Sequence, residues 1–321
     1  MRTHFLTTAM LGLLLAAGGA HAQQNYPTRP IRMIVPFPAG GQTDLVARIV
    51  TQRLGDAFKE TVVVDNRPGG GGTIGADIAL KASPDGYTLV MISVSYTTNA
   101  ALYKLPFDPL NDVTPISMLG DTGFVVTVNL ASPARSTKEL IAHARANPGK
   151  LNYASGGTGS STHLATELFN QMAGVSTTHV PYKGTGQGLT DLLAGNIQLV
   201  FAGFNQMLPH IKANRVRALA VSTEKRASAM PDIPTVGETL PGYEAVQWFA
   251  VLAPKGLPGN LVARWSKEVN GVLRLPDVKE RMTADGVDPA GGTPEHLRTV
   301  LQRDIAKWQE VVKAAGIKVG S

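Results

Sequence analysis

Residues 31–58, IRMIVPFPAGGQTDLVARIVTQRLGDAF, contain the segment from which the rest of the chain can be interpreted. The apolar residues at its start predict a short strand that is covered on both faces. Residues 36–41, PFPAGG, end that strand because proline cannot donate to a sheet ladder, and the two glycines let the backbone turn. Apolar residues then recur at helical spacing from Leu45 onward. The pattern predicts a strand, a first glycine loop (residues 36–41) and a helix N-terminus.

The same order occurs again in the second half of the chain. A short strand at residues 151–154 leads into a second glycine loop (residues 155–160, SGGTGS), which runs into a helix. Ligands of open parallel sheets bind at the carboxyl ends of strands, where loop amides and helix dipoles favour an anion. Two such loops predict two surfaces that close on one anionic ligand. In the alternative interpretation, hydroxyl residues such as Ser160 only cap the helix.

The N-terminus has the three regions of a secretory signal. Arg2 supplies the positive charge, residues 6–17 the apolar core, and residues 20–22, AHA, the cleavage site. We therefore expect residues 1–22 to be removed after Ala22 and the protein to be exported to the periplasm. The chain has no cysteine, which excludes disulfides and thiolate-bound metals. Its net charge of +6 is dispersed, without the basic and aromatic platform of a nucleic-acid-binding protein.

Several other motifs allow two interpretations. Gly70, Gly72 and Gly75 have dinucleotide-fingerprint spacing, but the next strand does not end in an acid, so a tight βα loop is favoured. Ser95 follows a strand at residues 87–93 and either faces a ligand or helps to cap a helix that starts near residue 97. His163 could act as a catalytic base, but no recognisable hydrolase motif or metal-ligand spacing accompanies it.

The order of elements predicts an α/β chain with two βα layers. Apolar runs at residues 124–128 and 245–253 are candidate crossings between the layers. We expect a signal peptide (1–22), a first domain (23–124 plus 248–321) and a second domain (125–247). The helices predicted in the tail, at residues 258–273 and 294–315, are expected to pack on the first domain.

The chain resembles the periplasmic solute receptors of the tripartite tricarboxylate transporter family, also called the Bug family. The matching stretches include YPTRPIRMIVPFPAGGQTDLVAR, VVVDNRPGGGGTIGA, ANPGKLNYASGGTGSSTHLATELF and MPDIPTVGETLPGYEAVQWFAVLAPKGLP, and together they span nearly the whole chain after the signal. The resemblance implies a two-domain, type II-like Venus-flytrap fold in which helices flank a mostly parallel sheet in each domain. It also implies capture of a small organic acid for membrane permease subunits, by a monomer with no cofactor, metal or nucleic-acid partner.

Carried over by position, the resemblance implies carboxylate contacts in both glycine loops through amides, hydroxyls and ordered water. The expected ligand-binding residues are Phe37, Ala39, Gly40, Gly41, Asp44, Gly157, Thr158, Gly159, Ser160 and His163. The segment 203–205, GFN, departs from the family pattern near the rim, which leaves the identity of the acid open. There Tyr96, Phe204 and Trp248 are candidate cleft walls, and Phe204 is also an expected ligand contact; all three could equally be core residues.

Two other functions are compatible with the sequence. A sensor accessory protein would bind the same acids and report to a kinase, and only its partner would distinguish it. A hydrolase or isomerase of exported small molecules would use Ser160 and His163 as its reactive pair, although no orienting acid is recognisable.

Overall fold

The computed structural model describes residues 26–182 and 184–318. The signal peptide predicted at residues 1–22 lies outside these ranges. The strands are β1 (Ile31–Val35), β2 (Val62–Asn66), β3 (Thr88–Ser93), β4 (Val113–Val128), β5 (Asn152–Ser155), β6 (Thr178–Pro181), β7 (Leu199–Gly203), β8 (Arg217–Val221), β9 (Val246–Pro254) and β10 (Asp288–Pro289).

The α-helices are α3 (Gln42–Phe58), α4 (Thr73–Leu80), α5 (Ser95–Leu102), α6 (Thr137–Ala146), α7 (Ser161–Ala173), α8 (Thr185–Ala194), α9 (Phe204–Lys212), α10 (Gly259–Val272), α11 (Pro276–Ala284) and α12 (Pro294–Ala314). Two short 3₁₀ helices, η1 (Gly70–Gly72) and η2 (Val236–Glu238), complete the described elements. Within the described ranges, no helix combines the length and apolarity needed to cross a bilayer.

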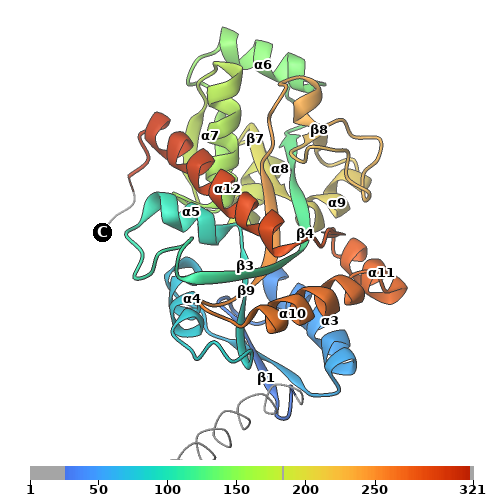
Figure 1. Cartoon of the computed structure of the whole chain (residues 1–321). Coiled ribbons are helices and arrows are strands. Elements are labelled where there is room, and N and C mark those ends of the chain that lie inside the picture. Colours follow the sequence, from blue (N-terminus) through green and yellow to red (C-terminus); the bar gives the residue numbers. More distant parts are fainter. Residues whose placement is uncertain (1–25, 183, 319–321) are drawn as a thin grey trace, which may run out of the picture.

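The strands form one 10-stranded sheet in the order β2-β1-β3-β9-β4-β7-β5-β6, with β10 and β8 also paired to β4. Pairing is parallel in the groups β2-β1-β3 and β7-β5-β6, and antiparallel around β9 and β4 in the centre. Figure 1 shows the two groups in the lower and upper parts of the molecule. The expected α/β fold with two βα layers is confirmed.

Helices cover both faces of each parallel group, which explains the apolar strands. In β1, Ile31, Met33 and Val35 pack with the core under α3 and α10, whereas Ile34 packs with the core under α4. In the second group, Tyr153 belongs to the core under α6 and α7, and its neighbour Ala154 to the core under α8 and α9. Successive strand residues point to opposite faces, so a strand buried on both faces needs apolar residues at nearly every position.

The centre of the sheet is an antiparallel ribbon made by β4 and β9. Paired residues run from Val113 with Pro254 to Gly123 with Val246, with two register shifts on the way. The apolar run at residues 124–128 is the end of a longer strand, because β4 continues through the Gly-Asp-Thr-Gly segment as one 16-residue strand. Its pairing with β9 on one side and with β10 at Asp121 supports the backbone through this segment.

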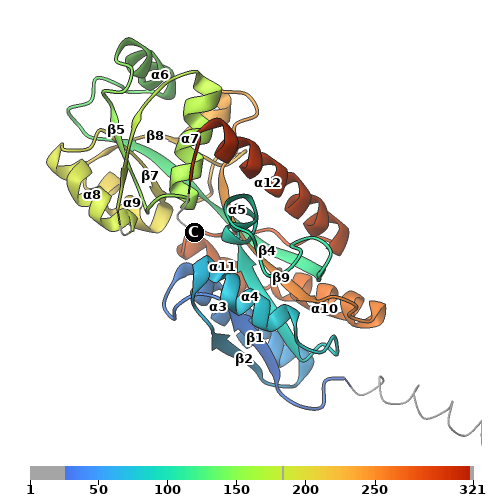
Figure 2. The same cartoon turned by 90° about the vertical axis from the view of Figure 1, so that its left-hand side faces the viewer.

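Helix α12 lies against both parts of the molecule. It contacts α5 and β4, and it also contacts α7, which belongs to residues 125–247 (Figure 2). The buried face of α12 includes Asp304, whose carboxylate accepts a hydrogen bond from the indole N–H of Trp248 at 2.7 Å. The expected packing of this helix on the first domain therefore describes one part of its contacts, and α7 supplies another.

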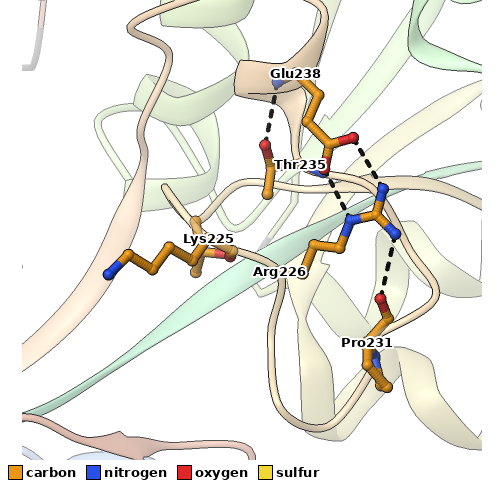
Figure 3. A network of polar contacts seen from close by, with 6 residues as sticks. Lys225, Arg226, Pro231, Thr235 and Glu238 are labelled. Carbon is orange, nitrogen blue, oxygen red and sulfur yellow. Dashed lines mark hydrogen bonds and ion pairs between the residues drawn. The ribbon is translucent and has the colours of Figure 1, made fainter.

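The loop between β8 and β9 is held by a polar network (Figure 3). Arg226 makes two hydrogen bonds of 2.9 Å to the carboxylate of Glu238, which together with Thr235 forms a capping box at η2. A bidentate pair fixes the relative orientation of the two side chains, even where its net contribution to stability is small. This network gives the loop after β8 a defined shape beside the central ribbon.

Candidate functional site

The two glycine loops follow parallel strands, as predicted. The first glycine loop joins the carboxyl end of β1 to α3, and the second joins the carboxyl end of β5 to α7. Gly40, Gly157 and Gly159 have positive φ angles of 81°, 121° and 79°, a region that favours glycine. Within the described part of the chain, no hydrogen bond or ion pair joins one loop to the other. The loops thus remain separate structural units at the ends of two strands.

The carboxylate of Asp44 binds back to the first glycine loop. It is 1% exposed and accepts from Gly40 N, Arg48 Nε and Asn66 Nδ2, each at 2.9 Å. Burial pushes the pKa of Asp44 upward, but the hydrogen bonds from Arg48, Gly40 and Asn66 outweigh it and hold the pKa below its ordinary value. Asn66 also donates to Phe37 O at 3.0 Å, so β2 and α3 fix the loop together.

The N-terminus of α3 has no side-chain cap. Its N-cap residue is Gly41, and Gly41 O accepts from Leu45 N at 3.0 Å. The amides of a first helical turn have no acceptor within the helix, so those of Gln42 and Thr43 are available to an anion or to water. The side chain of Gln42 accepts from Gln247 Nε2 at 3.3 Å and thus connects this helix end to the central ribbon.

The second glycine loop is held by its own hydroxyls and by two histidines. Ser160 caps α7 by accepting from His163 N at 3.3 Å, as the capping interpretation predicts. Gly156 N donates to Thr162 Oγ1 at 2.9 Å, and Gly159 N donates to His163 Nδ1 at 3.0 Å. His163 is 4% exposed, so its ring supports the loop from behind. Thr158 is the exposed residue at the tip of the loop.

This geometry gives no support to a Ser160–His163 reactive pair. The Ser160 hydroxyl bonds to the backbone N of His163 and lies 3.1 Å from Thr162 Oγ1, while the ring Nδ1 of His163 accepts from Gly159. A serine nucleophile needs its hydroxyl in hydrogen-bond contact with the ring nitrogen of its base. In residues 26–182 and 184–318 no cluster of His, Asp and Glu side chains has the arrangement of a metal site.

Ser95 lies beside a small hollow next to the first glycine loop. Helix α5 already begins at Ser95 and has no side-chain cap, so the interpretation of Ser95 as part of a cap was wrong. Its hydroxyl lies 3.0 Å from Ser93 Oγ. The hollow, of about 10 Å³, has room for one water molecule. It is lined by Pro36, Phe37, Gly71, Gly72, Thr73, Ile92, Ser93, Ser95, Tyr96, Asn99, Leu105 and Phe107.

The glycine run 69–72 forms the wall of this hollow by close packing. A Cβ on Gly72 would lie 3.1 Å from the Phe37 ring, and one on Gly71 would lie 3.1 Å from Asn99 Nδ2. Asn99 donates to Gly71 O at 2.9 Å. All four glycines have positive φ angles. The run is therefore the tight βα loop that the sequence favoured.

The candidate aromatic walls are all buried side chains. Trp248 is 1% exposed and binds Asp304, and Phe204 is 2% exposed and packs against Gly123 and Gly286. Tyr96 is 5% exposed, donates to Pro109 O at 3.0 Å, and reaches only the small hollow. Of the alternatives that the sequence left open, the core interpretation holds for Phe204 and Trp248.

A larger polar groove lies beside the central ribbon. Its volume is about 620 Å³, and its walls come from the loop after β8, from α11 and from β10. Burial raises the pKa of Asp121, one of its lining residues, to about 6, and the charges of Asp288 and Glu244 contribute to the rise. No sequence motif indicated this groove, because its charged residues are far apart in the chain.

Sequence reasoning also missed the residues that support the two loops. Asn66 donates to Phe37 O of the first glycine loop, and His179 Nε2 lies 2.6 Å from Ser155 Oγ of the second. For Asn66 a signal was present: it ends a parallel strand next to β1, where polar residues often face a site. His179 lies in a short strand, and nothing in its local pattern separates it from an ordinary strand residue.

The molecule has two parallel strand groups on either side of a crossing ribbon, and each group carries a glycine loop at a helix N-terminus. This arrangement places it in the class of periplasmic binding proteins. The chain belongs to the tripartite tricarboxylate transporter family receptors, whose family model matches residues 46–317. Protein BugT of Bordetella pertussis is 37% identical over 318 residues, which cover 97% of this chain and 98% of BugT.

Solved structures with substantial sequence identity have the same fold. R. palustris Rpa4515 with adipate has a TM-score of 0.77 and 36% identity, covering 91% of this chain and 99% of that one. MatC from Rhodopseudomonas palustris with bound malate has a TM-score of 0.73 and 30% identity, covering 89% and 100%. The chain is thus a receptor of the solute-binding type, in agreement with the expected family and fold.

Proposed function

We propose that this protein captures a small organic acid between the first and second glycine loops and delivers it to permease subunits of a tripartite tricarboxylate-type transporter. The observation that carries the proposal is the uncapped N-terminus of α3 at the carboxyl end of β1. It occurs in a chain that is 36% and 30% identical to proteins whose structures hold adipate and malate.

The electrostatics of the first glycine loop support a carboxylate ligand. A buried carboxylate needs hydrogen bonds, because its desolvation otherwise opposes binding. The charge of Asp44 is already satisfied by Arg48 and by two neutral donors. Asp44 therefore orients the loop, and the first-turn amides of Gln42 and Thr43 are the donors that we assign to the ligand. Gly41, Thr158 and Ser160 remain candidate contacts through their backbones and hydroxyls.

The proposal also includes the way in which the protein binds: two domains close on the ligand, and the ligand is not converted chemically. The domains would be residues 23–124 plus 248–321 and residues 125–247, connected where β4 and β9 cross. Hinge closure around a ligand is an established motion of such architectures. The receptor would act as an exported monomer after cleavage following Ala22. Small-angle X-ray scattering of the cleaved protein should give a smaller radius of gyration when ligand is bound.

Calorimetry with matched ligands tests the carboxylate proposal. The cleaved protein is titrated with adipate, malate and benzoate, and with adipamide as the neutral counterpart of adipate. We expect at least one acid to bind at least 100-fold more tightly than its amide, because loop amides favour the charged form. Equal affinity for an acid and its amide would refute the assignment. Recovery of the acid unchanged after incubation separates a receptor from a hydrolase or isomerase.

The sensor alternative is tested by the partner. Membranes from cells that carry the matching permease subunits should retain the ligand-loaded protein, whereas membranes without these subunits should not. Retention that depends instead on a membrane histidine kinase would replace transport by sensing and leave the ligand assignment intact.

A further inference from the structure

Two histidine rings are stacked behind the second glycine loop. The rings of His163, on α7, and His179, on β6, have centroids 3.8 Å apart and planes inclined by 8°. The ring of Tyr153, on β5, stacks on His179 at 5.0 Å and 24°. Tyr153 and His163 are buried beneath the loop, at 0% and 4% exposed, whereas His179 is partly exposed.

Each histidine holds a different part of the loop. His163 Nδ1 accepts from Gly159 N at 3.0 Å. His179 Nε2 lies 2.6 Å from Ser155 Oγ, and that hydroxyl accepts from Gly157 N at 3.1 Å. The directions of two glycine amides are therefore set through two imidazoles. Neither ring needs to touch the ligand to influence how the loop presents its donors.

We propose that His163 and His179 are positioning residues, whose stacked neutral rings hold the second glycine loop in its ligand-binding shape. The inference rests on the proposed function, since it concerns the loop to which that proposal assigns half of the carboxylate site. It adds that the loop keeps this shape only while the His163 ring is uncharged.

The hydrogen bond from Gly159 N requires a neutral His163 ring, whereas a protonated His179 could still donate from Nε2 to Ser155 Oγ. A protonated imidazole carries hydrogen on both nitrogens, so His163 would turn a donor toward the Gly159 N–H and lose that bond. Two cationic rings at 3.8 Å would also repel each other. Burial lowers the pKa of His163 to about 4, with His179 as a second cause, and burial also lowers the pKa of His179.

The surroundings of the stack offer little to stabilise a cation. The ring of Tyr153 stacks on both histidine rings, and Glu167 of α7 lies beyond it, in contact with the Tyr153 hydroxyl. The Glu167 carboxylate accepts from the Tyr153 hydroxyl and is thereby engaged. Acidification therefore converts the stack from a support of the loop into a source of repulsion.

The test uses variants that separate hydrogen bonding from titration. In His163→Asn the amide oxygen can replace Nδ1 as the acceptor for Gly159 N–H, but it cannot become charged. His163→Leu removes the acceptor altogether. His296→Asn is the matched control, because His296 is exposed in the first turn of α12, far from the loop in sequence.

Adipate affinity is measured by calorimetry between pH 7 and pH 3.5, and each variant is compared with wild type at the same pH, so protonation of adipate cancels. At pH 7 we expect His163→Asn to bind within threefold of wild type and His163→Leu to bind at least tenfold more weakly. At pH 3.5 wild type should lose about fourfold in affinity relative to His163→Asn, the factor that follows from a pKa of about 4. His296→Asn should follow wild type throughout.

A second readout needs no ligand. The ¹⁵N–¹H signal of Gly159 in the ligand-free protein should shift with a midpoint near pH 4 in wild type and stay level in His163→Asn. Equal pH profiles for wild type and His163→Asn, in both readouts, would overturn the positioning role while the receptor still binds acid. A protein that binds no carboxylate at any pH, but shows the Gly159 titration, would refute the proposed function and retain the structural coupling.

Discussion

Replacing Asp44 by asparagine removes the charge that ties the first glycine loop to α3. The carboxylate is 1% exposed and accepts from Gly40 N, Arg48 Nε and Asn66 Nδ2 at 2.9 Å. An asparagine side chain keeps one acceptor oxygen, but its NH₂ group must face one of these donors. The variant therefore loses at least one buried hydrogen bond and leaves a buried donor unpaired.

The magnitude follows from these contacts. A hydrogen bond to a charged group contributes roughly 1.5–3 kcal/mol, and an unsatisfied buried donor costs about 1–3 kcal/mol. The Arg48 side chain is 52% exposed, so its ion pair adds little. We expect Asp44→Asn to lower the free energy of unfolding by about 2–4 kcal/mol at pH 7.

Urea unfolding measures this loss, with Asp56→Asn as the control on the same helix. The Asp56 side chain is 67% exposed and, among the residues that the structure describes, pairs only with Arg53, so the loss should stay below about 1 kcal/mol. Because the folded-state pKa of Asp44 is lowered, its charge stabilises the protein above the unfolded pKa, and the difference between wild type and Asp44→Asn should shrink as the pH falls below about 4. A loss at pH 7 equal to that of Asp56→Asn would refute the reasoning.

Three further substitutions have defined outcomes. Burial raises the pKa of Asp121 to about 6, so its charged form destabilises the folded state. Asp121→Asn should therefore add about 1–3 kcal/mol of stability at pH 7, and this gain should disappear as the pH falls from 6 to 4. Urea unfolding of both proteins at pH 7 and at pH 4 checks the sign. Trp248→Phe removes the donor to fully buried Asp304 and should cost about 2 kcal/mol by the same method, whereas an unchanged midpoint would contradict the role of that bond. In Gly72→Ala the residue has a φ of 103° and the added Cβ would lie 3.1 Å from the Phe37 ring, a strain that costs about 1–3 kcal/mol. The variant should therefore have a lower melting temperature and bind adipate more weakly. An unaltered melting curve would count against the packing argument.

The local sequence was sufficient to predict the elements and the loops. Proline and glycine at residues 36–41 mark the end of β1 and the start of α3, and the serine and glycine residues at 155–160 mark the start of α7. Continuous apolar strands indicated helices on both faces. These features depend on neighbours in the sequence, and therefore a pattern of a few residues is enough to identify them.

Contacts between distant segments could not be predicted in this way. The sequence left the role of Asp44 open, because Asn66, one of its donors, is 22 residues away in β2. The stack of His163 and His179 depends on two tertiary arrangements: the parallel pairing of β5 with β6 sets His179 beside Tyr153, and α7 places the ring of His163 over that of His179. The local pattern around Trp248 could not show that it is a core residue, because its hydrogen-bond partner, Asp304, lies 56 residues further on.

The continuous pairing of β4 with β9 has a mechanical consequence. A connection made of two independent loops could flex in any direction, and closing on a ligand would then cost the entropy of ordering both loops. Here the two strands stay hydrogen-bonded to each other as far as Gly123 and Val246. Such a hydrogen-bonded ribbon resists stretching and shear of one strand along the other, but it can twist about its long axis. The two halves should therefore approach each other along one rotational path, with most of the ligand's binding energy left to determine which acid is retained.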